Sequence, residues 1–172
     1  MILEDINEFL NFLNPNKKDY NRCNDAMKSI QLSNEQIKDV LYWHPEYYTR
    51  NLLSRTEIYE VYICCWLPGQ ASPVHDVNGQ NSWCKIIQGS LELNVYQDNK
   101  KIAHRILQQN DLMEPLDKNI MYSLSNTQNV KTISLHLVSL PVNTFGVNNQ
   151  KTNDVEWVQK YYHTINGTII QH

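Results

Sequence analysis

Residues 72–92, SPVHDVNGQNSWCKIIQGSLE, contain one histidine, His75, in a position that suits a metal ligand on a β-strand. Side chains alternate along a strand, so the residue two positions further on, Val77, faces the same side as His75. A strand that carries a metal site needs a ligand at both positions, and valine offers no lone pair. The stretch therefore predicts either a metal centre that other side chains complete or a site that holds no metal.

Several side chains outside this pair are candidate donors: Asp76, Cys84, Glu92, His104 and His136. Asp76 points to the opposite face of a regular strand, although a β-bulge would reverse that direction. A set made of His75, Cys84 and His136 would favour zinc over iron, because thiolate and imidazole ligands suit zinc. The alternative is that His75 is an interior histidine held by hydrogen bonds.

The elements that must position these side chains begin with helices, which are predicted for residues 1–44. Apolar residues at helical spacing mark the first helix, and Asn14-Pro15-Asn16 ends it; these residues are Ile6, Phe9, Leu10 and Leu13. Ser33 followed by Gln36 fits a capping box. That box opens a further helix, whose apolar face consists of Ile37, Val40 and Leu41.

Residues 45–172 predict strands instead. Runs rich in β-branched and aromatic residues are separated by the turn sequences PGQ, QGS, QDNK and QQND; the runs are 59–67, 83–88, 91–97, 102–107 and 132–140. The tail is predicted to add a closing hairpin that turns at Asn166-Gly167. We therefore expect an all-β, jelly-roll-like barrel behind a small helical N-terminal segment, with residues 1–172 forming a single domain.

Four motifs occur in order along the chain: YYTRNLL (47–53), CWLPGQASPVHD (65–76), KIIQGSLE (85–92) and SLHLVSLP (134–141). Together they resemble the cysteine dioxygenase family of thiol oxygenases, within the cupin superfamily. The resemblance runs over nearly the whole chain and implies a cupin β-barrel behind a helical N-terminal region. It also implies the family's reaction, which is the oxidation of L-cysteine to cysteine sulfinic acid with Fe(II) and O₂.

The family binds ferrous iron through three histidines, and the resemblance places these ligands at His75, Val77 and Met121. Met121 takes the third position because it lies thirteen residues before Ser134 of the SLH motif. His75 is then the sole retained ligand, since a methionine thioether is a poor ligand for ferrous iron. The chemistry belongs to the iron, so the resemblance implies that dioxygenase activity is weak or absent here and that the protein holds little or no Fe(II).

The family's arginine that binds the substrate carboxylate corresponds to Arg50, with Tyr48 two residues earlier on the same strand face. An arginine inside a barrel is costly unless an anion pairs with it. A bound ligand would supply that anion, and so would one of three glutamates: Glu57, Glu60 or Glu92. Ligand binding and a structural ion pair both remain open at this stage.

The serine and histidine that support the family's site correspond to Ser134 and His136, which would equally form a buried hydrogen-bond network. The family's tyrosine after this motif is Val138 here. The cysteine that cross-links to that tyrosine in some members falls at Ser82, two positions before Cys84. No cysteine–tyrosine thioether is therefore expected at this pair.

Composition excludes several classes of partner. The net charge of the 172 residues is −3 and like charges form no long run, which argues against nucleic acid or an anionic membrane. Asp5, Glu8 and Asn11 interrupt the apolar N-terminus, so no signal peptide is expected, and no later stretch suits a membrane span. The cysteines show no paired spacing, which predicts free thiols in a cytoplasmic protein; they are Cys23, Cys64, Cys65 and Cys84.

Three hypotheses for function follow. The first is a divergent, weak or inactive relative of cysteine dioxygenase, expected as a monomer, that binds a small thiol or amino acid through Arg50 and Tyr48. The second is a working thiol dioxygenase with an unusual metal site. The third is a cupin used as a scaffold without catalysis. The ligand positions separate the second hypothesis from the others, and the partner of Arg50 separates the first from the third.

Overall fold

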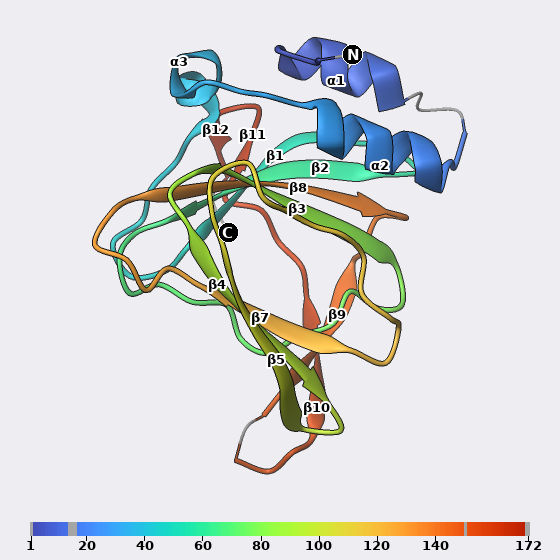
Figure 1. Ribbon diagram of the computed structural model, residues 1–172, viewed down its shortest axis with the longest axis vertical. Helices are drawn as coiled ribbons and strands as arrows, with labels where there is room; N and C mark the ends of the chain where they lie inside the picture. Colours follow the sequence, from blue (N-terminus) through green and yellow to red (C-terminus); the bar gives the residue numbers. More distant parts are fainter. Residues whose placement is uncertain (1, 14–16, 150, 171–172) are drawn as a thin grey trace.

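The computed structural model describes residues 2–13, 17–149 and 151–170 as a β-barrel with helices packed along one side (Figure 1). A seven-stranded sheet has the order β12-β11-β1-β2-β8-β3-β6. Its strands are β1 Thr49–Arg55, β2 Glu60–Trp66, β3 Asn81–Gln88, β6 Leu112–Met113, β8 Thr132–Ser139, β11 Thr164–Ile165 and β12 Thr168–Ile169. The prediction of an all-β barrel is confirmed.

A three-stranded sheet of order β5-β4-β7 lies opposite the large sheet, and the hairpin β9-β10 lies beside it (Figure 1). These strands are β4 Leu91–Gln97, β5 Lys100–Leu107, β7 Met121–Ser125, β9 Thr144–Asn148 and β10 Val155–Gln159. The predicted runs at 59–67, 83–88, 91–97, 102–107 and 132–140 correspond to β2, β3, β4, β5 and β8. The hairpin β9-β10 was not predicted.

Strand β2 is buried along its whole length and divides its side chains between two cores. Val61, Ile63 and Cys65 pack under the helices, whereas Tyr62, Cys64 and Trp66 point into the barrel. This period-two alternation places the adjacent Cys64 and Cys65 on opposite faces, as predicted. All four cysteines of the chain are free and buried.

The helices α1 Ile6–Leu13, α2 Tyr20–Ser29, α3 Asn34–Ile37 and the 3₁₀ turn η1 Lys38–Val40 cover the outer face of the large sheet (Figure 1). Phe9 and Leu13 of α1 are buried, as their spacing predicted, whereas the Asn14-Pro15-Asn16 stop lies outside the described residues. The amide of Ser33 donates to Gln36 Oε1 at 2.7 Å. The helix predicted after this capping box is short and ends at Ile37.

Lys85 of β3 attaches the helices to the barrel. Its buried ammonium donates to the carbonyl oxygens of Met27, Lys28 and Ile30 at 3.0, 3.0 and 2.7 Å. These carbonyls lie at the C-terminal end of α2, where a helix has no internal donors left for them. A cation at this end also complements the helix dipole.

The C-terminal segment closes the barrel as predicted, with an antiparallel hairpin of β11 and β12 that turns at Asn166 and Gly167. Both residues have positive φ, 47° and 80°, which this tight turn requires. Strand β11 runs parallel to β1 in the large sheet, and so brings residues 160–163 across the barrel opening. Within the described part of the chain, no helix is both long and apolar enough to cross a membrane.

Candidate functional site in the barrel cavity

A cavity with about 30 Å³ of free volume lies inside the barrel. One water molecule needs roughly 10–15 Å³ on this scale, so the cavity suits a guest of a few heavy atoms. Its lining includes seven residues singled out from the sequence, which are Tyr48, Arg50, His75, Asp76, Val77, His136 and Val138. Strand alternation places His136 and Val138 of β8 on one inward face. The strand predicted at His75 is wrong: residues 75–77 lie between β2 and β3, where His75 forms only isolated bridges, and Asp76 lines the cavity together with His75 and Val77.

His75 is tied to the opposite wall through its main chain. Its amide donates to Tyr122 O and its carbonyl accepts from Tyr122 N, both at 2.9 Å. The imidazole Nδ1 lies 2.9 Å from Pro73 O, and a carbonyl oxygen only accepts, so Nδ1 carries the proton and Nε2 is the basic nitrogen. Burial lowers the pKa of His75 to about 4, which keeps the ring neutral.

The structure corrects the third predicted ligand position. Residues of β7 alternate between half-buried and buried, and it is Tyr122 that lines the cavity, whereas Met121 lies on the other face. The count back from Ser134 was therefore one residue off, and a shift of one residue along a strand reverses the face. Val77 lines the cavity as predicted. The positions beside His75 thus carry an isopropyl group and a phenol.

Arg50 and Tyr48 meet inside the cavity. Arg50 Nη2 donates to Tyr48 Oη at 2.5 Å, and the guanidinium carbon also lies 5.5 Å from the centre of the Phe145 ring. The Tyr48 ring stacks on Trp66 at 4.2 Å between centroids. Burial raises the pKa of Tyr48 to about 12, although Arg50 acts against it, so the phenol keeps its proton and is able to donate to a ligand.

No glutamate neutralises Arg50. Glu60 pairs with Arg55 and Lys160, and Glu92 lies 3.4 Å from His104 Nε2 on the β4-β5 pair. Across the described residues, Glu57 included, no carboxylate forms an ion pair with Arg50. The structural ion pair considered for Arg50 is therefore wrong.

Ser134 and His136 form a buried chain with Trp66. Trp66 Nε1 donates to Ser134 Oγ at 2.9 Å, and Ser134 Oγ lies 2.8 Å from His136 Nε2. The indole only donates, so Ser134 Oγ accepts from Trp66, and its second hydrogen bond joins it to the imidazole of His136. Burial lowers the pKa of His136 to about 3, and its ring stacks on Tyr62 with centroids 4.9 Å apart. The network that the sequence suggested is present, and His136 also lines the cavity.

The donor set does not fit a metal ion. No group of three or more His, Cys, Asp or Glu side chains within residues 2–13, 17–149 and 151–170 is arranged to hold one. The set of His75, Cys84 and His136 considered above is therefore wrong. Asp76 Oδ1 is engaged by the amides of Asn78 and Gly146, and burial raises the pKa of Tyr122, so no phenolate is available.

The positions of the family's cross-link do lie together. Ser82 on β3 and Val138 on β8 are register partners, and Val138 pairs with Glu60 on its other side. Neither a thiol nor a phenol stands at this pair of positions. Glu60, which faces inward, is thus level with Ser82 and Val138 across the three neighbouring strands.

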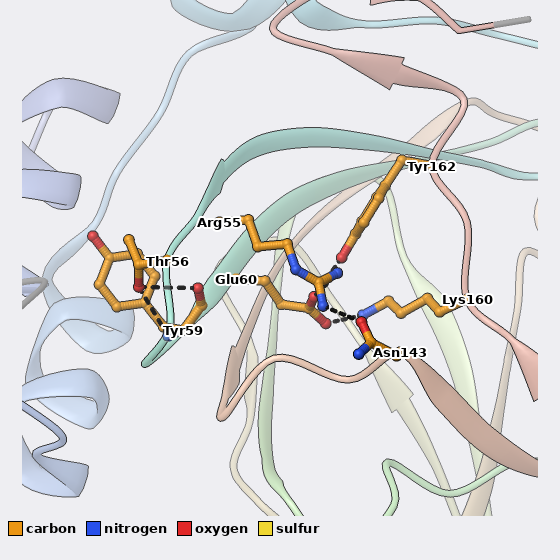
Figure 2. Close-up of polar contacts among 7 residues, drawn as sticks. All are labelled: Arg55, Thr56, Tyr59, Glu60, Asn143, Lys160 and Tyr162. Carbon is orange, nitrogen blue, oxygen red and sulfur yellow. Dashed lines mark hydrogen bonds and ion pairs between the residues drawn. The ribbon is translucent and has the colours of Figure 1, made fainter.

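Sequence reasoning missed the polar network around Glu60. Its carboxylate is fully buried and accepts from Tyr162 Oη at 2.5 Å and from Arg55 Nη1 at 3.1 Å, while Lys160 Nζ contacts its other oxygen (Figure 2). A glutamate in a wholly buried strand was the one signal available in the sequence. Its partners on the tail lie about a hundred residues away, at separations that no local pattern connects.

Comparison with known proteins decides the family. The family model for cysteine dioxygenase type I matches residues 2–151. The chain belongs to this family. Human and bovine cysteine dioxygenase type 1 are each 29% identical to it over 126 residues, which cover 68% of this chain and 63% of theirs; the mouse protein is 28% identical over the same length. The chain thus spans less than two thirds of the length of these relatives.

Solved structures confirm the cupin fold of this family member. An RmlC-like cupin from Desulfovibrio desulfuricans matches with a TM-score of 0.50 and 14% identity, covering 59% of this chain and 91% of its own. A Klebsiella pneumoniae protein with a double-stranded β-helix domain matches with a TM-score of 0.51 and 15% identity, covering 72% and 95%. In this chain Arg50 and Tyr48 line the barrel cavity, and the described residues contain no group of three or more His, Cys, Asp or Glu side chains arranged to hold a metal ion.

Proposed function

We propose that this cysteine dioxygenase family member binds a small carboxylate-bearing molecule, such as a thiol acid or an amino acid, and has little or no dioxygenase activity. The observation that carries this proposal is Arg50, a half-buried cavity arginine that forms no ion pair within the described chain. A guanidinium removed from water without an anion is costly, and a bidentate carboxylate offsets that cost. Tyr48 adds a second donor beside it.

The residues beside His75 support the proposal that dioxygenase activity is weak or absent. The family reaction needs a held ferrous ion, but Val77 and a protonated Tyr122 stand beside His75, and the second cavity imidazole, His136, lies 2.8 Å from Ser134 Oγ. What remains is a pocket that orients a carboxylate, with apolar groups around the rest of the ligand. We further infer that the protein is a monomer and that it lies in the cytoplasm. The four free, buried cysteines suit the reducing conditions of that compartment.

The test is a calorimetric titration of the protein, treated with chelator, with propanoate, 3-mercaptopropanoate and L-cysteine. We expect these ligands to bind the native chain, and to bind Arg50→Met at least about tenfold more weakly. One hydrogen-bonded pair of charged groups contributes roughly 1.4 kcal/mol or more to binding, and tenfold in affinity corresponds to that loss. Arg105→Met, on the exposed face of β5, is the matched control and should bind as the native chain does. Absence of binding to the native chain would favour the scaffold hypothesis instead.

A further inference from the structure

Lys160 is a cavity residue contributed by a part of the chain beyond residues 2–151, the region that the family model matches. It follows β10, and only 6% of its side chain is exposed. Its main-chain amide donates to Asn143 O at 2.7 Å, which fixes the segment across the barrel. The ammonium therefore reaches the cavity beside Glu60 of β2, and three residues later the amide of His163 donates to Arg50 O of β1 at 2.8 Å.

The surroundings of Lys160 consist of one acid and two aromatic rings. Nζ contacts Glu60 (Figure 2). It lies 4.2 Å from the centre of the Tyr62 ring and 5.5 Å from that of Tyr162. Tyr162 and Arg55 hold the other carboxylate oxygen of Glu60, so the acid is fixed in place. Arg55 is itself held by Asn143 Oδ1 at 2.5 Å.

Glu60 points inward because of the turn that precedes it. The Thr56 amide donates to Tyr59 O at 2.9 Å, and the Tyr59 amide donates back to Thr56 Oγ1 at 3.1 Å (Figure 2). This closed turn sets the register in which Arg55 faces Glu60 across β1 and β2. The acid next to Lys160 is thus fixed by backbone geometry.

The amine of Lys160 is easier to deprotonate than that of a surface lysine. Burial lowers its pKa to about 8, with Glu60 acting in the opposite direction and Arg50 adding to the decrease. The charged and titratable groups that face it include Glu60, Arg50, Tyr62, Cys64, Tyr162, His75 and His136. Near pH 7.5 its free-amine fraction is about two hundred times that of an exposed lysine of ordinary pKa, ~10.4.

We propose that Lys160 forms an imine with the carbonyl group of a short oxo acid whose carboxylate lies on Arg50. This inference rests on the proposed carboxylate site and names the ligand class. Lysine amines of lowered pKa in apolar surroundings are the ones that react in this way. The small cavity limits the ligand to a few heavy atoms between the two cations.

The step balances without an oxidant or reductant. The Lys160 ammonium first passes a proton to Glu60, and the free amine then attacks the carbonyl carbon to form a carbinolamine. In that step a second proton moves from Nζ to the former carbonyl oxygen and makes the carbinolamine hydroxyl. The proton on Glu60 then converts this hydroxyl into water, which leaves as the C=N bond forms, while Nζ keeps its last proton. The sum is ammonium plus carbonyl giving protonated imine plus water, and Glu60 ends as a carboxylate, as it began.

The experiment is reductive trapping with glyoxylate and cyanoborohydride on the whole chain at pH 7.5, followed by intact mass and peptide mapping. Three exposed lysines in the same sample, Lys100, Lys101 and Lys118, serve as internal controls. We expect the adduct at Lys160 to form at least about tenfold faster than at these three. Equal rates at Lys160 and at the exposed lysines would overturn the inference.

Two variants and a competitor test the geometry. Lys160→Arg keeps a cation for Glu60 but forms no imine, so the fast-labelled site should vanish while the melting temperature stays close to native. Arg50→Met should slow Lys160 labelling by glyoxylate but not by acetaldehyde, which has no carboxylate. If Arg50→Met does not fold, saturating propanoate on the native chain should slow labelling at Lys160 and leave Lys100 unchanged. Unaltered glyoxylate labelling in these tests contradicts the Arg50 anchor.

The propanoate titration separates this inference from the proposed function. Propanoate binding without fast labelling of Lys160 overturns the imine and leaves the carboxylate site. Fast labelling of Lys160 without propanoate binding contradicts the carboxylate site, and with it the restriction to oxo acids.

Discussion

Tyr122 lies directly across from His75, and their main chains exchange two hydrogen bonds of 2.9 Å. The ring centroids are 4.6 Å apart, so the phenol occupies the space beside the one imidazole that the family's iron site would use. The side chain next to it in sequence, Met121, lies on the other face of β7. This arrangement determines how a metal site would have to be rebuilt.

Replacing Val77→His together with Tyr122→His should create a site for ferrous iron beside His75. Filling the valine position with imidazole risks overpacking by about 1–3 kcal/mol, which metal binding to the folded chain would offset. Anaerobic titration with Fe(II) should show at least about tenfold tighter binding than in the native chain. The matched control is Val77→His with Met121→His, whose second imidazole faces away; equal iron binding by both double variants would refute the orientation of β7.

Tyr48→Phe should weaken propanoate binding without unfolding the chain. The change removes the phenol that accepts from Arg50 Nη2 but keeps the ring that stacks on Trp66. The loss of a hydrogen bond to a charged group, about 1.5 kcal/mol, predicts roughly tenfold weaker binding. Calorimetry measures this change, and an unaltered dissociation constant would show that Tyr48 does not help to bind the ligand.

Lys85→Met should lower the free energy of unfolding by about 2–4 kcal/mol, because three carbonyls at the end of α2 lose their donor. Urea denaturation measures the loss. Lys28→Met is the control: this lysine pairs with Glu114 at the surface, where both side chains are about half exposed, so its removal should cost less than about 1 kcal/mol. Similar losses in both variants would contradict the role assigned to Lys85.

Stability should fall as the pH drops below about 6.5, in part because of His136. Its pKa is about 3 in the folded chain, where burial disfavours the charged ring, and ~6.5 when unfolded. The unfolded chain therefore binds the proton first, so this contribution is complete above the unfolded pKa and is lost as the pH falls toward 3. Between pH 7 and pH 5 the loss amounts to about 2 kcal/mol.

Urea denaturation of native protein and His136→Gln at both pH values isolates this histidine. The difference in unfolding free energy between pH 7 and pH 5 should be about 2 kcal/mol smaller in the variant, since glutamine does not titrate. Parallel pH profiles for the two proteins would show that His136 is charged in the fold.

The barrel could be predicted because its signals are local. Alternating apolar residues, turn sequences and the pair Asn166-Gly167 lie within a few residues of one another, and they predicted β2 to β5, β8 and the closing hairpin. Arg50, His75 and Val77 do line one cavity as predicted, but the segment that contains His75 and Val77 is not a strand, and Asp76 between them lines the cavity too. The hairpin β9-β10 lacked such a signal, and its strand β10 is exposed along its whole length.

The remaining part of the site depends on tertiary structure. A count along the sequence missed the inward residue of β7 by one position, and with a period of two that error chose Met121 in place of Tyr122. Lys160 reaches Glu60 across a separation of a hundred residues, which only the closed barrel reveals. The isolation of Arg50 from carboxylates likewise depends on where Glu60 and Glu92 find other partners.

Formation of cysteine sulfinate is the most direct test of our proposal that this cavity binds a carboxylate but has little or no dioxygenase activity. Purified protein would be incubated in air with L-cysteine and excess ferrous iron, and the sulfinate measured by chromatography against a protein-free sample. We predict no formation above that background, since Val77 and Tyr122 leave His75 without partner ligands. Catalytic formation of sulfinate that disappears in His75→Ala and in Arg50→Met would contradict this conclusion.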